Sequence, residues 1–155
     1  MLAVLIANQC QKLLVIVPSD ALRTQIAEKF ITLGLLKEFG IVGSAASYPA
    51  VGIMRQSFAD PAEFEQFVRQ SNVVVATMAI LQTLSPAQLK HLATECSHVF
   101  IDEAHHVKAT SWQYVKDHFD GRKVLQFTAT PFRNDGQRLE GNILFNFPLS
   151  EAQRQ

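Results

Sequence analysis

Four short, mainly apolar runs constrain the fold of this sequence more than any other feature. They are Leu13–Val17, Val73–Ala76, His98–Ile101 and Lys123–Phe127, and stretches with helical periodicity separate them. Unbroken apolar runs rich in β-branched residues are typical of strands that are buried on both faces. Their alternation with helices predicts an α/β fold, with a mostly parallel sheet flanked by helices on both faces. Asn142–Phe147 is a weaker candidate for a fifth strand.

Capping residues indicate where the intervening helices begin and end. Ser19 precedes a segment whose large apolar side chains recur every three or four residues, and Gly34 is expected to end that helix. Asp60 and Ser85 each precede a proline and have Glu or Gln three residues later, which is the pattern of a capping box. Thr77 is expected to cap a short helix directly after the second strand.

The composition excludes two classes of protein. Hydrophobic residues make up 48% of the 155 residues and charged residues only 18%, which excludes a disordered chain. The 14 Lys and Arg balance the 14 Asp and Glu, so the chain lacks the basic excess of a protein that binds nucleic acid through bulk charge. Any contact with nucleic acid is therefore expected to be local.

The cysteines and the N-terminus favour a cytoplasmic protein. Cys10 and Cys96 are too few for a disulfide framework, which indicates a reducing compartment. The apolar segment Met1–Ala7 has neither the basic residues nor the cleavage site of a signal peptide. No run approaches the about 18 apolar residues of a membrane span, so we expect no membrane association.

Two adjacent acids directly after the third apolar run carry the clearest chemical signal. Asp102 and Glu103 continue into Ala104, His105 and His106. Phosphoryl transfer uses such a pair, with one acid to hold Mg²⁺, usually through water, and one to orient and deprotonate the attacking water. The alternative is a strand that simply ends in a solvated acidic turn.

A pair of hydroxyl side chains follows the fourth apolar run. Thr128 and Thr130 flank Ala129 and precede Pro131. Their hydroxyls can bond to a neighbouring backbone group or to a carboxylate. Taken alone, the segment is equally consistent with an ordinary hydroxyl-stabilised turn before a proline.

Together these segments resemble superfamily-two helicases, the DEAD/DEAH-box ATPases. Asp102–His105 is similar to motif II of that family, Thr128–Thr130 to motif III, Val17–Gln25 to motif Ia and Val75–Leu81 to motif Ib. The Thr-Ala-Thr-Pro-Phe-Arg form and the doubled histidine resemble the branch of type III restriction subunits and DNA-repair helicases. The resemblance implies the first RecA-like motor domain of a helicase, using ATP and Mg²⁺, with DNA favoured over RNA as partner.

The resemblance also implies a role for individual residues. Asp102 would hold the Mg²⁺ of ATP through water, and Glu103 would be the catalytic base. His105 would couple the nucleotide state to the nucleic-acid face together with Thr128 and Thr130. The residues implied to contact the phosphate backbone of a single strand are Pro18, Ser19, Arg23 and Thr77.

The sequence departs from the family at one essential motif. The phosphate-binding loop G-x-x-x-x-G-K-[ST] does not occur among the 155 residues, and Met1–Asn8 resembles the helix that follows that loop in the family. We expect residues 1–148 to be a partial RecA-like domain and residues 149–155 to start a linker towards a second motor domain. Such a fragment is expected not to hydrolyse ATP at a useful rate. It is also expected to lack a strand inside the sheet and to self-associate through an exposed edge.

Two other interpretations stay open. A metal site is suggested by a cluster of ligand-type residues whose spacing matches no closed zinc pattern. Its members are His91, Cys96, His98, His105 and His106. The second is a degenerate domain that binds nucleic acid or protein without catalysis, which a lysine-containing loop encoded upstream would exclude.

Overall fold

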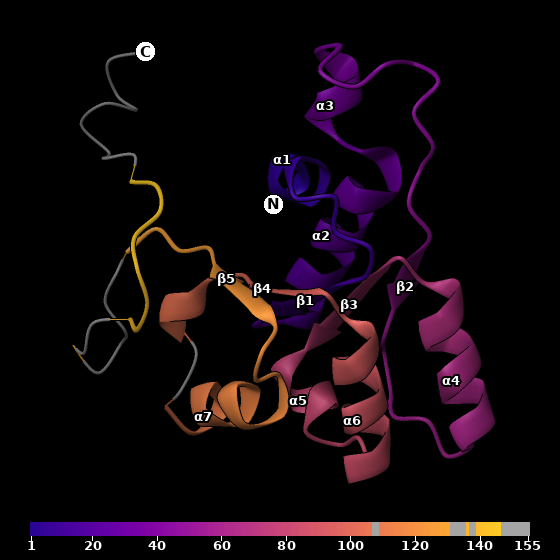
Figure 1. Ribbon diagram of the computed structural model, residues 1–155, viewed down its shortest axis with the longest axis vertical. Coiled ribbons are helices and arrows are strands. Elements are labelled where there is room, and N and C mark those ends of the chain that lie inside the picture. The colour runs from indigo at the N-terminus through magenta and orange to yellow at the C-terminus, as the bar shows by residue number, and fades with distance from the viewer. Residues whose placement is uncertain (107–108, 131–135, 137–138, 147–155) are drawn as a thin grey trace.

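The structure, a computed structural model, describes residues 1–106, 109–130, 136 and 139–146 (Figure 1). Its helices and strands alternate along the chain almost throughout. In order they are α1 (Leu2–Ala7), β1 (Leu13–Val17), α2 (Asp20–Thr32), α3 (Leu35–Glu38), β2 (Val51–Ile53), α4 (Pro61–Gln70), β3 (Val73–Thr77), α5 (Met78–Leu81), α6 (Pro86–Glu95), β4 (His98–Ile101), the 3-10 helix η1 (Ala104–His106), α7 (Ala109–His118) and β5 (Lys123–Gln126).

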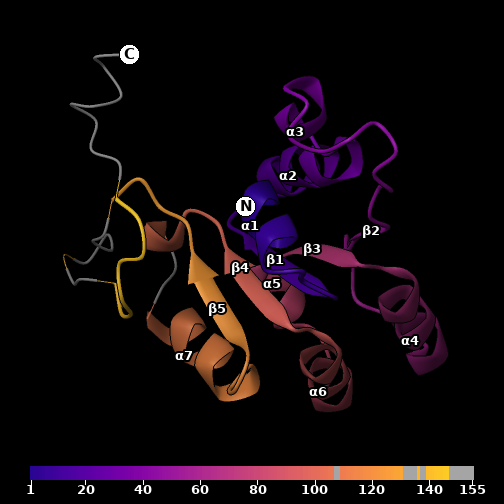
Figure 2. The same cartoon turned by 45° about the horizontal axis from the view of Figure 1, so that its top comes forward.

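The five strands form one parallel sheet in the order β2-β3-β1-β4-β5. Helices α1 to α3 lie on one side of this sheet and α4 to α7 on the other, and Figure 2 shows the strands following one another from β5 to β2. The predicted α/β fold, with a parallel sheet flanked by helices on both faces, is therefore confirmed. No helix of the described residues is long and apolar enough to cross a lipid bilayer.

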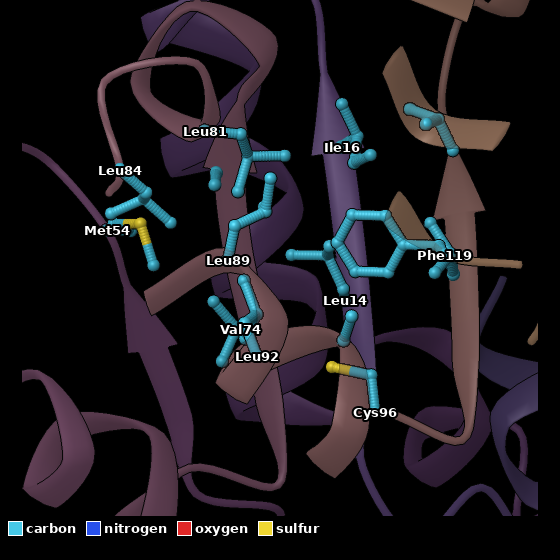
Figure 3. Packing of buried hydrophobic residues seen from close by; sticks show 14 of the residues in the cluster. Leu14, Ile16, Met54, Val74, Leu81, Leu84, Leu89, Leu92, Cys96 and Phe119 are labelled. Atoms are coloured by element: carbon cyan, nitrogen blue, oxygen red, sulfur yellow. The ribbon is translucent and has the colours of Figure 1, made fainter. Parts of the chain in front are cut away.

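Each face of the sheet carries its own hydrophobic core, because successive side chains of a strand point to opposite faces. On one face Leu13 and Val15 pack with Ile26 and Phe30 of α2. On the other face Leu14 meets the side chains of α4, α5, α6 and α7. Figure 3 shows part of this second core, with labelled side chains Leu14, Ile16, Met54, Val74, Leu81, Leu84, Leu89, Leu92, Cys96 and Phe119.

The predicted helix caps are present with two adjustments, of which the first is that Asp60 caps α4 by accepting from Ala62 N at 2.9 Å and not through the reciprocal capping box with Glu63. The Ser19 hydroxyl accepts from Leu22 N at 3.4 Å, and Ser85 and Gln88 form the complete reciprocal capping box. Helix α2 ends at Thr32 rather than at Gly34, and Leu33 caps it in the left-handed conformation with φ of 56°. Leu33 is buried, with 3% exposure, so its packing holds a conformation that glycine would adopt more easily.

The fifth strand expected at Asn142–Phe147 is wrong over residues 142–146, and Phe147 lies outside the described residues. Residues 142–146 are not in a strand, and Leu144 and Phe145 are 82% and 83% exposed. The fifth strand is instead β2, which pairs with β3. Its three residues contain a glycine, so it lacks the apolar run by which the other strands are recognised.

The sheet has no gap among the described residues. β4 pairs with β1 on one side and β5 on the other, and β5 is an edge strand. An additional strand would therefore join this sheet at one of its edges, β5 or β2. Self-association through such an edge stays a prediction, and the linker expected at residues 149–155 lies outside the described residues.

Candidate functional site

The residues singled out from the sequence lie along the carboxyl edge of the sheet. Ligands of parallel α/β sheets commonly bind at this edge. Asp102 directly follows β4, and Thr128 comes two residues after the end of the neighbouring strand β5. Ser19 follows β1, and Thr77 is the last residue of β3. Because β4 and β5 are neighbours, Asp102 and Thr128 lie close to each other at this edge. Ser19 and Thr77 lie at the ends of β1 and β3, the next two strands of the sheet.

Backbone hydrogen bonds hold the turn that carries the two acids. Asp102 N donates to Ile16 O at 2.9 Å, and Ala104 N donates to Phe127 O at 3.1 Å. Between them Glu103 has a φ of 48°, in the left-handed region that residues with a side chain rarely adopt. Such a conformation costs on the order of 1 kcal/mol and is often found at functional sites. The turn thus carries two consecutive carboxylates, Asp102 and Glu103, at the carboxyl end of β4.

His105 connects the turn after β4 with the segment after β5. Its Nδ1 lies 2.8 Å from Thr128 Oγ1. The Thr128 hydroxyl donates to Thr130 O at 2.7 Å and accepts from Thr130 N at 3.2 Å. The structure therefore brings together the three residues that the resemblance assigned to coupling. The turn formed by Thr128 and Thr130 is itself held by its own hydroxyl, as expected for a hydroxyl-stabilised turn.

Glu103 contacts the same imidazole ring. Its Oε2 atom lies 3.3 Å from His105 Nδ1, and the two side chains are 40% and 17% exposed. Glu103 is thus accessible to water while it stays within reach of the ring. This contact places the candidate base in the same network as the motif III turn.

The Asp102 side chain is partly buried at the end of β4. Burial raises the pKa of the Asp102 carboxyl, and the adjacent Glu103 carboxylate raises it further. The Lys29 ammonium of α2 and the amino group of Met1 act in the opposite direction more weakly. Lys29 carries no recognisable signal in the sequence, because only the packing of α2 on the sheet brings it near Asp102. A carboxylate disfavoured in this way is one that a bound cation would stabilise.

We expect replacement of Asp102 by asparagine to stabilise the folded chain at neutral pH. The folded state binds the Asp102 proton more tightly than the unfolded state, so stability falls as pH rises from the unfolded pKa of about 3.8 through the raised pKa. Asparagine avoids this cost, and each kcal/mol gained raises Tm by about 2–4 °C for a chain of this size. Thermal denaturation should show the difference at pH 8 and a smaller one at pH 4.

A matched control for this experiment is Asp117→Asn. Asp117 is exposed on α7 and accepts a hydrogen bond from Gln113, which an asparagine oxygen can also accept. Its Tm should follow the wild-type value at both pH values. A Tm advantage of Asp102→Asn that is larger at pH 4 than at pH 8 would contradict the expected sign.

The four candidates for nucleic-acid contact differ in exposure. Pro18 and Ser19 are exposed after β1. Thr77 is buried, and its hydroxyl caps α5 by accepting from Ile80 N at 3.4 Å. Arg23 is also buried, with 4% exposure, and its Nη1 lies 2.8 Å from Asp20 Oδ1. Its Nε has no hydrogen-bond partner among the described residues. Pro18 and Ser19 are therefore exposed to solvent, whereas Thr77 and Arg23 are buried.

The cluster suggested as a metal site is divided between the two ends of β4. Cys96 and His98 lie at the amino end, and burial raises the pKa of the Cys96 thiol to about 12. His105 lies beyond the carboxyl end, and the side chain of His106 lies outside the described part of the chain. Within that part, no three His, Cys, Asp or Glu residues are grouped as metal ligands.

Comparison with known proteins identifies the family. The sequence profile of one family, described as type III restriction enzyme, res subunit, matches residues 1–133. The chain belongs to this family. The match spans all five strands and both the Asp102–His105 and Thr128–Thr130 segments. No curated protein matches the sequence. The chain is therefore a helicase-like, restriction-related NTPase domain, of a family that uses ATP and acts on nucleic acid.

Proposed function

We propose that this chain carries the acids that bind Mg²⁺ and activate water in an ATP-dependent helicase or translocase. The observation that supports this most directly is the 2.8 Å contact between His105 and Thr128. This contact joins the motif II turn to the motif III turn across two neighbouring strands. An acidic turn that only ended a strand would not require a partner of this kind.

The residues at the turn suit a magnesium ion. Mg²⁺ in nucleotide sites is held by one or two carboxylates together with water and phosphate oxygens. Asp102 offers a carboxylate whose negative charge is unfavourable where it lies, so a cation would be accepted there. When bound, the ion neutralises charge on the phosphate oxygens. Asp102 would hold it through water.

The neighbouring acid is placed for proton transfer. The Glu103 side chain is 40% exposed and can contact a water molecule. It would orient that water and accept its proton as the water oxygen attacks the γ-phosphorus, while the bond from phosphorus to the β,γ-bridging oxygen breaks and ADP leaves. His105 and Thr128 would transmit the presence of the γ-phosphate to the nucleic-acid side, where Pro18 and Ser19 are exposed after β1. Single-stranded DNA is the proposed partner, with a second RecA-like domain completing the motor.

Catalysis also needs groups that hold the β- and γ-phosphates. The G-x-x-x-x-G-K-[ST] loop that provides backbone amides and a lysine does not occur in these 155 residues. We therefore expect the purified 155-residue chain to bind ATP weakly and to hydrolyse it no faster than a buffer control. Hydrolysis is measured by phosphate release, with and without single-stranded DNA. Strong ATPase activity stimulated by DNA would contradict this prediction.

The metal site is tested on the same chain with Mn²⁺ as a paramagnetic substitute for Mg²⁺. In the presence of ATP, Mn²⁺ is expected to broaden the amide NMR signals of residues 102–105 first. Asp102→Asn should remove this selective broadening and Asp117→Asn should preserve it. Broadening centred elsewhere would contradict the proposal. Binding of single-stranded DNA without any effect of Mn²⁺ and ATP would favour the degenerate, binding-only domain.

A further inference from the structure

We propose that Asp20 is an internal competitor for a phosphate-binding position at the start of α2, because it holds the guanidinium of Arg23. Both residues belong to the first four positions of the helix, and Asp20 Oδ1 lies 2.8 Å from Arg23 Nη1. A phosphate group that displaced this carboxylate would gain the arginine. The inference rests on the proposed contact with single-stranded DNA and names a residue that weakens that contact.

The burial of Arg23 leaves its charge incompletely compensated. The residue is only 4% exposed, and a buried cation is favourable only when it is both paired and hydrogen-bonded. Among the described residues, neither Nε nor Nη1 has a hydrogen-bond partner. The close approach of Asp20 therefore supplies an opposite charge but no well-directed hydrogen bond. Arg23 keeps donor groups that a second anion could use.

The Asp20 side chain marks the side from which an anion can reach this guanidinium. Arg23 Nη1 is buried, whereas the Asp20 side chain that contacts it is 77% exposed. Rotation of the aspartate into solvent would therefore uncover Nη1 without any movement of the backbone. The carboxylate thus occupies the position that an oxygen of an incoming phosphate would take.

The start of α2 favours a phosphate group in two further ways. The helix has 13 residues and begins beside the exposed Ser19, and the N-terminus of a helix attracts negative charge. A phosphate can also accept from two guanidinium nitrogens at once, as arginine and phosphate commonly pair. The Asp20 carboxylate is tethered three residues away on the same helix, so its approach is restricted. The two anions therefore compete for one cation.

The test is binding of a fluorescent oligothymidylate to the 155-residue chain, measured by anisotropy over a range of salt concentrations. Asp20→Asn should bind about tenfold more tightly than the wild type, the gain from one hydrogen bond to a charged group. The plot of log K against log salt should become steeper by about 0.7, as for one more neutralised phosphate of a single strand. Asp117→Asn on α7, across the sheet, makes the same change of net charge and should gain less than about twofold.

Arg23→Met separates the role of the arginine from the simple loss of a negative charge. Methionine fills a buried position without a charge, and in this background Asp20→Asn should no longer tighten binding. Two results would overturn the inference. One is that Asp20→Asn binds the oligonucleotide no more tightly than Asp117→Asn, and the other is that its gain persists in the Arg23→Met background.

A second measurement needs neither DNA nor the Arg23→Met variant. The Nε–H signal of Arg23 in the NMR spectrum should shift when inorganic phosphate is added to Asp20→Asn, and it should shift less in the wild type. Absence of a shift in both proteins would overturn the inference. A shift in Asp20→Asn without binding of the oligonucleotide would support the competition between Asp20 and phosphate and would contradict the proposed DNA partner.

Discussion

Replacement of Glu103 by glutamine is expected to lower ATP turnover by roughly 10²–10⁴-fold in a form of this protein that hydrolyses ATP. Glutamine keeps the size of the side chain and can still accept a hydrogen bond from His105 through its amide oxygen. It cannot take a proton from the attacking water. The loss should therefore appear in kcat, while nucleotide affinity changes little.

The control for this substitution is Glu65→Gln. Glu65 is exposed on α4, on the far side of the sheet from α2 and remote from β5 in the strand order. The same chemical change there should leave kcat unchanged. If Glu103→Gln retained more than about half of the wild-type kcat, Glu103 would not be the base, and the proposed mechanism would be wrong.

Replacement of Gly52 by alanine is expected to lower the free energy of unfolding by about 1–3 kcal/mol, the usual cost of overpacking a core. A Cβ at this position of β2 would lie 2.8 Å from Phe67 Cζ and would overlap Ser71 Oγ. Ser71 is buried, and its hydroxyl donates to Phe67 O at 2.8 Å, so it cannot turn away without losing that bond. The connection between α4 and β3 therefore has to shift to admit the methyl group.

Gly43→Ala is the matched control for this prediction. A Cβ at Gly43 would meet no atom within 4 Å, and its φ is outside the left-handed region. Its free energy of unfolding should equal or slightly exceed the wild-type value, because alanine has less conformational freedom when unfolded. Urea denaturation followed by circular dichroism measures both variants. Equal midpoints for Gly52→Ala and Gly43→Ala would show that β2 does not pack as closely as described.

The central strands could be predicted because they are buried on both faces. Leu13–Val17 and Val73–Thr77 are buried along their whole length, so almost every residue in them is apolar. The same reasoning does not identify β2, because Val51 and Ile53 are only partly buried and Gly52, although buried, has no apolar side chain. It also gave a strand at Asn142–Phe147, where apolar residues are present but residues 142–146 are largely exposed. Apolar content alone is therefore not sufficient, since it also identified β5, whose residues are exposed or only partly buried.

The sequence indicated which polar residues lie at the carboxyl ends of the strands, but it did not indicate which contacts they make. The polar residues after β4 and β5 are visible as breaks in apolar runs, and the parallel sheet places them at one edge. The sequence did not indicate which of the polar candidates would be exposed and which would be buried. Arg23 was expected to face a nucleic-acid strand, yet it is 4% exposed, because the fourth residue of α2 turns towards the core.

The sequence by itself determined the layered α/β fold, the caps that begin most helices and the identity of the acids and hydroxyls at the strand ends. These properties follow from local patterns, in which apolar runs and capping side chains act over a few residues. Only the tertiary structure decided that β4 and β5 are neighbours and that His105 reaches Thr128, 23 residues away. It also decided that Glu103 adopts a left-handed conformation. These three features depend on packing between segments that are distant in the sequence. The strand order and the hydrogen bonds between the strands bring those segments together.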